Sequence, residues 1–161
     1  MKWGSHILLT ASAVSIFDLS AVPFSIVGAV FPDIIEVYLR KKHRSLHVLA
    51  TYFLASIPAF FIHKYLFFFI FSAFLHVLED SFTISGVKLW HGSKRPTSFG
   101  MIKTGSVAEY FIVAVVCLPL IWLASLQFSS GFVPFFYNWF SLYEQGVIDA
   151  FELKKNRFNF F

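Results

Sequence analysis

Three long apolar runs dominate the sequence and limit what the chain can fold into. They cover residues 46–62, 65–78 and 107–126, and each approaches or reaches the roughly 17–25 residues typical of a membrane-spanning helix. Only 14% of the residues are charged and 23 of the 161 are Phe, whereas an ordinary soluble domain has about 25% charged residues. A soluble helical domain could not bury so much Phe. The sequence therefore predicts an all-α integral membrane protein.

The shorter segments predict a polytopic helical bundle of about three hairpins in a single domain, 1–161. Residues 6–17 and 21–31 have 12 and 11 residues. Each is too short to cross alone, because such helices reach only about 17 Å. The turn at 18–20 would let them form a short or re-entrant pair. Runs 46–62 and 65–78 form a second hairpin, which would bring His47 and His76 close together. Run 107–126 pairs with a return at 131–150.

The basic residues are distributed unevenly in this layout. Twelve of the thirteen Lys and Arg residues fall on one side, and only Lys64 lies opposite. The positive-inside rule then predicts a multi-pass protein of the cell (inner or plasma) membrane with both termini cytoplasmic. Basic patches beside apolar spans indicate anionic lipid rather than nucleic acid. The expected partners are membrane lipid and, through the Phe-rich surfaces, a membrane-protein partner or a second copy of the chain; no nucleic acid is expected.

Polar residues gather at four segment ends on the predicted cytoplasmic side. They are His6, Asp33, Glu36, His43, His47, His76 and Asp80. The i, i+4 spacings of His43/His47 and His76/Asp80 predict that both members of each pair share one helix face. Imidazole nitrogens and carboxylate oxygens from neighbouring helices are suitable ligands for a divalent metal, zinc or manganese above all. The same convergence is also typical of a polar network that ties helices together.

Several short motifs occur in a recognisable order. The chain reads His6, GAVFPD at 28–33, HRSLH at 43–47, LHVLEDSFTISGVKLW at 75–90 and TGSVAE at 104–109. Over about positions 6 to 109 this pattern resembles the YdjM-like (LexA-regulated) membrane-bound metal-dependent hydrolases. The resemblance implies that the metal and catalytic positions are His6, Asp33, His43, His47, His76 and Asp80.

The chain also departs from that family's pattern. The second Asp of the Pro-Asp-Ile-Asp-His motif is Ile35, and Glu36 stands near the position of its His. Trp90 is followed by His91 instead of Pro, and the usual Thr before the second His of the HRSLH element is missing. A site that has lost an Asp is expected to bind one metal instead of two, or to bind it weakly.

The residues and the resemblance together predict a metal-dependent hydrolase with its site at the cytoplasmic membrane face. The expected metal ligands are His6, Asp33, His47, His76 and Asp80. His43 or Glu36 would accept a proton, and Arg44 would steady an anionic substrate. Glu109 would orient a ligand histidine or simply be a carboxylate in a helix's first turn. Two alternatives remain open: a non-enzymatic membrane subunit or scaffold with a structural cluster, and a transporter that uses the cluster as a relay.

Overall fold

In the computed structural model the chain forms helices that pack side by side, and the structure describes residues 1–39, 46–93, 96–130, 144, 146 and 149. The elements are α1 (Trp3–Phe17), the short 3-10 helix η1 (Leu19–Ala21), α2 (Val22–Tyr38), α3 (Leu49–Ile62), α4 (Lys64–Ser81) and α5 (Val107–Ser130). Within the described residues there is no strand, only three isolated β-bridges. The predicted all-α class is confirmed.

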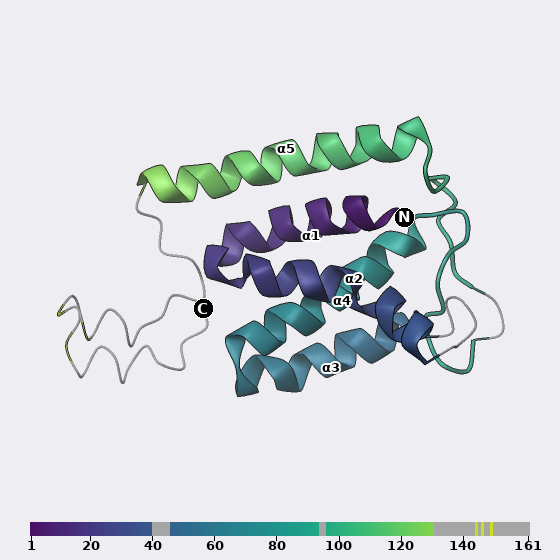
Figure 1. Cartoon of the computed structure of the whole chain (residues 1–161), viewed down its shortest axis with the longest axis horizontal. Coiled ribbons are helices and arrows are strands. Elements are labelled where there is room, and N and C mark those ends of the chain that lie inside the picture. The colour runs from purple at the N-terminus through teal and green to yellow at the C-terminus, as the bar shows by residue number, and fades with distance from the viewer. Residues whose placement is uncertain (40–45, 94–95, 131–143, 145, 147–148, 150–161) are drawn as a thin grey trace.

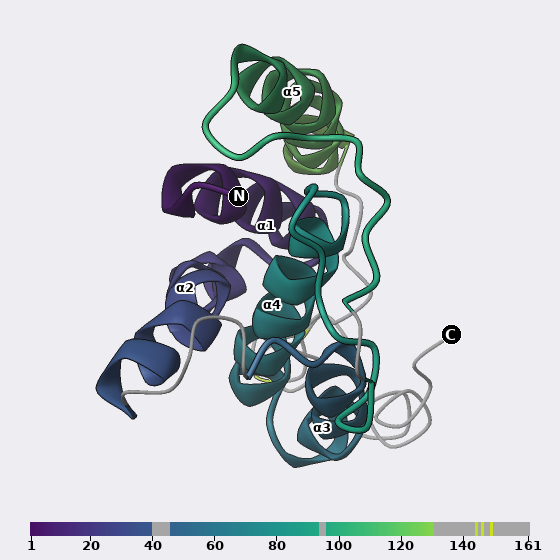
Figure 2. The same cartoon turned by 90° about the vertical axis from the view of Figure 1, so that its right-hand side faces the viewer.

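Helix α4 lies at the centre of the arrangement. Both α2 and α3 pack on α4, α1 packs on α2, and α5 lies along α1 (Figures 1 and 2). Helices α3 and α4 form the predicted hairpin, joined at His63, whose side chain accepts a hydrogen bond from the Tyr65 amide at the start of α4. As a result, the beginnings of α1, α3 and α5 and the ends of α2 and α4 gather at one end of the bundle (Figure 1).

The second segment is longer than the sequence predicted. Instead of ending at 31, the helical stretch from Leu19 to Tyr38 is 20 residues long and apolar enough to span a membrane. Pro32 is accommodated inside α2, as neighbouring helices allow in membrane bundles. Among the described residues, Val107–Ser125 is the other helix of this kind, while α1 and α3 are shorter apolar helices. The predicted return at 131–150 lies almost entirely outside the described residues.

The interior of the bundle contains many polar side chains beside its apolar ones, while the outer surface is rich in large apolar side chains. Its fully buried side chains include three histidines and small hydroxyl residues such as Ser25 and Ser72. Its exposed side chains include many large apolar ones, among them Leu8, Val27, Phe53, Phe61, Phe111 and Leu118. Soluble proteins show the reverse preference. Small or polar residues between helices with large apolar residues outside are typical of helices packed in a bilayer.

An ion pair closes the opposite end of the bundle. Lys64 Nζ lies 2.8 Å from Asp18 Oδ2, and Asp18 Oδ1 accepts a hydrogen bond of 2.9 Å from the Ser20 amide. Burial alone would raise the pKa of Asp18, but the contacts with Lys64 and Ser20 outweigh it and hold that pKa below its ordinary value. The pair therefore ties the turn after α1 to the start of α4.

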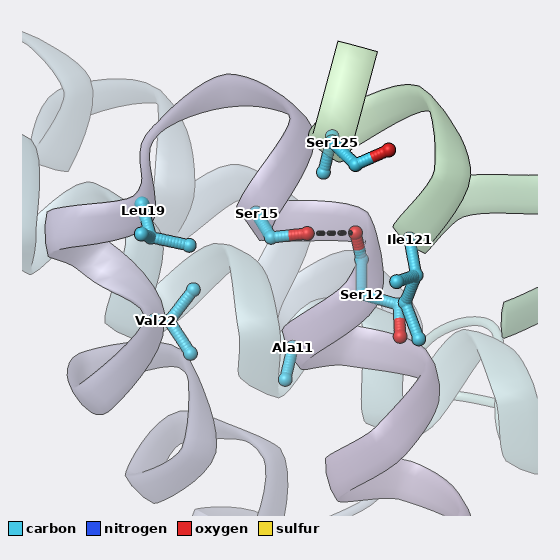
Figure 3. A pocket seen from close by; sticks show the side chains of 8 residues that line it. Ala11, Ser12, Ser15, Leu19, Val22, Ile121 and Ser125 are labelled. Carbon is cyan, nitrogen blue, oxygen red and sulfur yellow. Dashed lines mark hydrogen bonds between the residues drawn. The ribbon is translucent and has the colours of Figure 1, made fainter. Parts of the chain in front are cut away.

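A cavity of about 380 Å³ lies in this half of the molecule, between α1, the η1–α2 segment and α5 (Figure 3). Its lining combines aliphatic residues with three serines: Ala11, Ser12, Ser15, Leu19, Val22, Ile121, Ala124 and Ser125. The hydroxyls of Ser15 and Ser125 donate to carbonyl oxygens of their own helices, each at 2.7 Å. The cavity thus offers few polar atoms, and it is separate from the histidine cluster.

Candidate metal centre

Five of the predicted ligands come together where the helix ends meet. His6 lies near the start of α1, Asp33 in the second half of α2, and His47 just before α3, while His76 and Asp80 lie one turn apart near the end of α4. The three histidine side chains are fully buried. The predicted approach of His47 to His76 is confirmed, since their Nε2 atoms are 3.1 Å apart.

Each of the three histidines has its Nδ1 atom held by an oxygen acceptor. The partners are Glu79 Oε2 for His6 at 2.6 Å, Glu36 Oε1 for His47 at 3.1 Å, and the Ala29 carbonyl oxygen for His76 at 2.5 Å. Because carboxylates and carbonyls accept hydrogen bonds, these contacts place the proton of a neutral imidazole on Nδ1 and leave the Nε2 lone pair for another partner. This is the arrangement that orients metal-binding histidines in proteins.

The Nε2 atoms of the three histidines lie close to the oxygens of two carboxylates. Asp33 Oδ1 lies 3.1 Å from His47 Nε2 and 3.7 Å from His76 Nε2. On the other side, Asp80 Oδ1 lies 3.4 Å from His6 Nε2. Adjacent ligands held about 2.0–2.2 Å from a metal, in tetrahedral or octahedral geometry, are about 3.0–3.5 Å apart. The closest of these donor pairs are therefore spaced like neighbouring ligands of a metal ion.

The donors form two overlapping sets. One contains His6, His76 and Asp80, and the other contains Asp33, His47 and His76; within each set the ligand atoms lie within 4.8 Å of one another. His6 Nε2 is buried and makes no hydrogen bond within the described part of the chain. A buried nitrogen without a hydrogen bond is rare and calls for a partner. These buried His and Asp groups could hold a metal ion, with His76 central to either set.

Further contacts set the charge balance of the centre. Trp3 Nε1 donates to Asp33 Oδ2 at 2.6 Å, and the α-amino group of Met1 pairs with Asp80 Oδ1. Burial alone would lower the pKa of His47, but its contacts with Asp33 and Glu36 outweigh burial and raise that pKa above its ordinary value. Below this raised pKa, a metal that binds His47 has to displace a proton.

Comparisons with known proteins found no relative that would assign a role to the centre. No family model matches the sequence, and no curated protein or solved structure matches it. The resemblance to the YdjM-like hydrolases therefore stays a prediction from motifs. Function is inferred instead from the contacts among the buried His and Asp residues.

The HRSLH element differs from its predicted form. His43 and Arg44 lie outside the described residues. His47 is not on a helix face, because α3 begins only at Leu49 and Val48 before it is extended, with φ −110° and ψ 110°. The predicted helical pair of His43 and His47 is therefore wrong. The local reason is a β-bridge between Val48 and Lys88, which holds this segment extended.

Glu36 and Glu109, the two carboxylates predicted to assist the site, do not belong to either set of candidate metal ligands. Glu36 accepts from the Leu46 amide at 2.6 Å and lies against His47 Nδ1, so it orients that imidazole; its role as proton acceptor stays a prediction. Glu109 is fully buried, but in the described structure its hydrogen bonds go to the Lys2 amide, the Ser5 hydroxyl and the Gly105 amide. Of its two predicted roles, that of a carboxylate in the first turn of a helix, α5, is confirmed; none of these hydrogen bonds is with a ligand histidine. Glu109 fixes the start of α1 against α5.

Three supporting groups were not assigned from the sequence. They are the Glu79 carboxylate, the Trp3 indole and the Ala29 carbonyl. The sequence does contain a feature that indicates a role for Glu79: its charge stands between His76 and Asp80 in an apolar helix, where a charge is costly. Trp3 and Ala29 have no such feature, because an indole or a backbone carbonyl at a helix contact is too common to indicate a site.

Glu79→Gln tests whether the support behind His6 matters. We expect metal affinity to fall about 10–100-fold, which is typical for removal of a carboxylate behind a ligand histidine. The measurement is a competitive titration of the purified protein against a metal-indicator dye. Glu144→Gln is the matched control, because Glu144 is exposed. Equal affinities for both variants and the wild type would show that the Glu79 contact does not support a ligand.

Proposed function

We propose that the protein is a membrane-bound, metal-dependent hydrolase whose His/Asp centre lies at the cytoplasmic membrane face. The observation that carries the proposal is the common orientation of three fully buried histidines, each with Nδ1 held by an oxygen acceptor. A purely structural cluster does not need this repeated arrangement, whereas metal-binding histidines almost always have it. The motif resemblance to the YdjM-like hydrolases supports the same reading.

The donor set suits zinc or manganese, which bind imidazole nitrogen and carboxylate oxygen together. When bound, such an ion supplies an activated water and polarises a phosphoryl or acyl oxygen. His6, His47, His76, Asp33 and Asp80 would hold it, while Glu79 and Glu36 keep two of the imidazoles in orientation. Asp33 is the most exposed of the five ligands, with 18% of its side chain accessible, so we place the approach of the substrate on its side of the centre.

Membrane insertion is proposed on the basis of the two candidate spanning helices and the apolar outer surface. The α3–α4 hairpin and α1 would complete the bundle within the bilayer. Of the four lysines among the described residues, Lys2, Lys88 and Lys103 belong to the end of the bundle that holds the centre and Lys64 belongs to the opposite end. This distribution favours the cytoplasmic side for the centre and for both termini.

The orientation predicts that Lys64 is the one Lys or Arg of the sequence on the non-cytoplasmic side. Single cysteines introduced at positions 42, 64 and 94 in a Cys117→Ser background can be labelled with an impermeant maleimide in intact cells. We expect labelling from outside only at position 64. Outside labelling at position 42 or 94 would contradict the orientation, and labelling of all three after lysis is the control for accessibility.

Metal content and hydrolysis test the function itself. We expect purified wild-type protein to carry stoichiometric zinc or manganese, or to take it up on incubation. The metal-loaded protein should then hydrolyse a chromogenic phosphate or acyl ester or a phospholipid headgroup ester. Metal without hydrolysis of any of these would favour a relay in transport, and protein that never binds metal would favour the scaffold.

A further inference from the structure

The connection between α4 and α5, residues 82–106, forms a cap across the end of the bundle that holds the His/Asp centre (Figures 1 and 2). Bridges join Thr83 to Ile102 and Val87 to Thr97, and the Lys88 amide donates to the His47 carbonyl at 3.2 Å. Residues 94 and 95 lie outside the described part of the chain. The rest of the cap is fixed to itself and to the segment before α3.

The cap exposes many large apolar side chains. Its inward side chains Val87 and Ile102 are buried, while large apolar side chains point outward: Phe82, Ile84, Leu89, Trp90, Phe99 and Met101. The most exposed of these, Met101 and Phe99, are 68% and 62% accessible. A cluster of exposed large apolar residues on one connection indicates a surface that meets something other than water.

The charges of the cap indicate which kind of partner its outer surface contacts. From Ser81 to Ala108 the sequence has no Asp or Glu, while the half-buried Lys88 and the exposed Lys103 each stand within two residues of an exposed apolar side chain. A second copy of the chain would bring lysines against lysines, which is unfavourable. An anionic lipid surface instead complements the lysines and accommodates Trp and Phe at headgroup level.

We infer that the outer surface of the cap rests in the headgroup layer of an anionic leaflet, with its apolar side chains in the interface and Lys88 and Lys103 on lipid phosphates. This goes beyond the proposed hydrolysis, because it requires neither a bound metal nor a reaction, and it rests on the proposed membrane insertion of the bundle. Because the Lys88 amide donates a hydrogen bond to the His47 carbonyl, a cap in the headgroup layer would also hold the His/Asp centre at that depth.

The test measures the depth of the cap in bilayers of defined charge. Full-length Cys117→Ser protein, with a single cysteine at Leu89 or Met101, is labelled with a polarity-sensitive fluorophore. It is placed in nanodiscs of phosphatidylcholine alone or mixed with phosphatidylglycerol. We expect blue-shifted emission, and quenching by lipids that carry a shallow nitroxide, in the anionic discs. Each lysine is expected to favour the inserted state about fivefold, from the typical electrostatic gain of one basic residue at such a surface.

Charge variants and a reference position make the result decisive. Lys88→Gln with Lys103→Gln should weaken the dependence on anionic lipid by about 25-fold, at fivefold for each lysine, while Lys88→Arg with Lys103→Arg should retain it. A probe at Leu118, an exposed residue in the middle of α5, reports membrane insertion of the bundle independently of the cap. If Leu118 is lipid-quenched but Leu89 and Met101 stay accessible to an aqueous quencher, the inference is wrong. It is equally wrong if their blue shift depends on protein concentration rather than on lipid charge, which would indicate a protein partner.

Discussion

His76→Ala is expected to strip the purified protein of stoichiometric metal and to abolish hydrolysis with it. His76 belongs to both sets of donor atoms, so its removal leaves neither set complete. Loss of an orienting partner alone typically costs 10–100-fold in metal affinity. We therefore expect loss of this ligand to cost at least about 100-fold. The bundle should stay helical, because α4 keeps its packing against α2 and α3.

Elemental analysis by mass spectrometry and far-ultraviolet circular dichroism on the same preparations measure the two effects. His63→Ala is the matched control, since His63 is exposed and caps α4 at the opposite end of the bundle. It should leave metal content unchanged. If the cluster is only an interhelical network, His76→Ala would lower thermal stability while the wild type itself binds no metal after incubation with zinc or manganese. That pair of results would favour the scaffold.

Local spacing was enough to predict part of the centre. His76 and Asp80 are four residues apart in one helix, so their shared face follows from helical geometry. The short connection at His63 makes α3 and α4 antiparallel neighbours, which brings His47 back to His76. Both inferences use only residues close in sequence or joined by a tight turn, and these are the features that a sequence determines most directly.

The features that the sequence did not predict involve contacts over long separations in sequence. His47 is extended because the segment before α3 pairs with Lys88, about forty residues later. Glu109 binds Ser5 and the Lys2 amide because α5 lies along α1. Neither pairing has a periodic signal, since each depends on how the helices pack after they form.

The sequence also does not predict how α2 is rotated about its axis relative to α4. This rotation points Asp33 into the centre and places the Ala29 carbonyl on His76 Nδ1. It is set by two small buried residues of α2 that contact α4, Gly28 and Ala29. Small residues allow helix backbones to approach closely, but the sequence alone does not say which helix they contact.

The closeness of that contact leads to a second large effect: Gly28→Ala should destabilise the bundle and weaken metal binding together. A Cβ at Gly28 would lie 2.2 Å from the Phe69 carbonyl oxygen and 2.9 Å from Ser72 Cβ. A backbone oxygen in a helix cannot turn away, so α2 and α4 must separate. Overpacking of this kind typically costs about 1–3 kcal/mol. Because Ala29 and Asp33 move with α2, the hydrogen bond to His76 and one carboxylate ligand should shift as well.

Gly4→Ala is the matched control, because a Cβ at Gly4 meets nothing within 4 Å. In the helix α1 it should be neutral or stabilising by up to about 1 kcal/mol, since alanine favours a helix more than glycine does. Thermal unfolding in detergent and the dye titration measure both variants. We expect a lower unfolding temperature and weaker metal binding only for Gly28→Ala. Unchanged stability and affinity in that variant would mean that α2 and α4 do not approach at Gly28, and that another contact sets the position of Asp33.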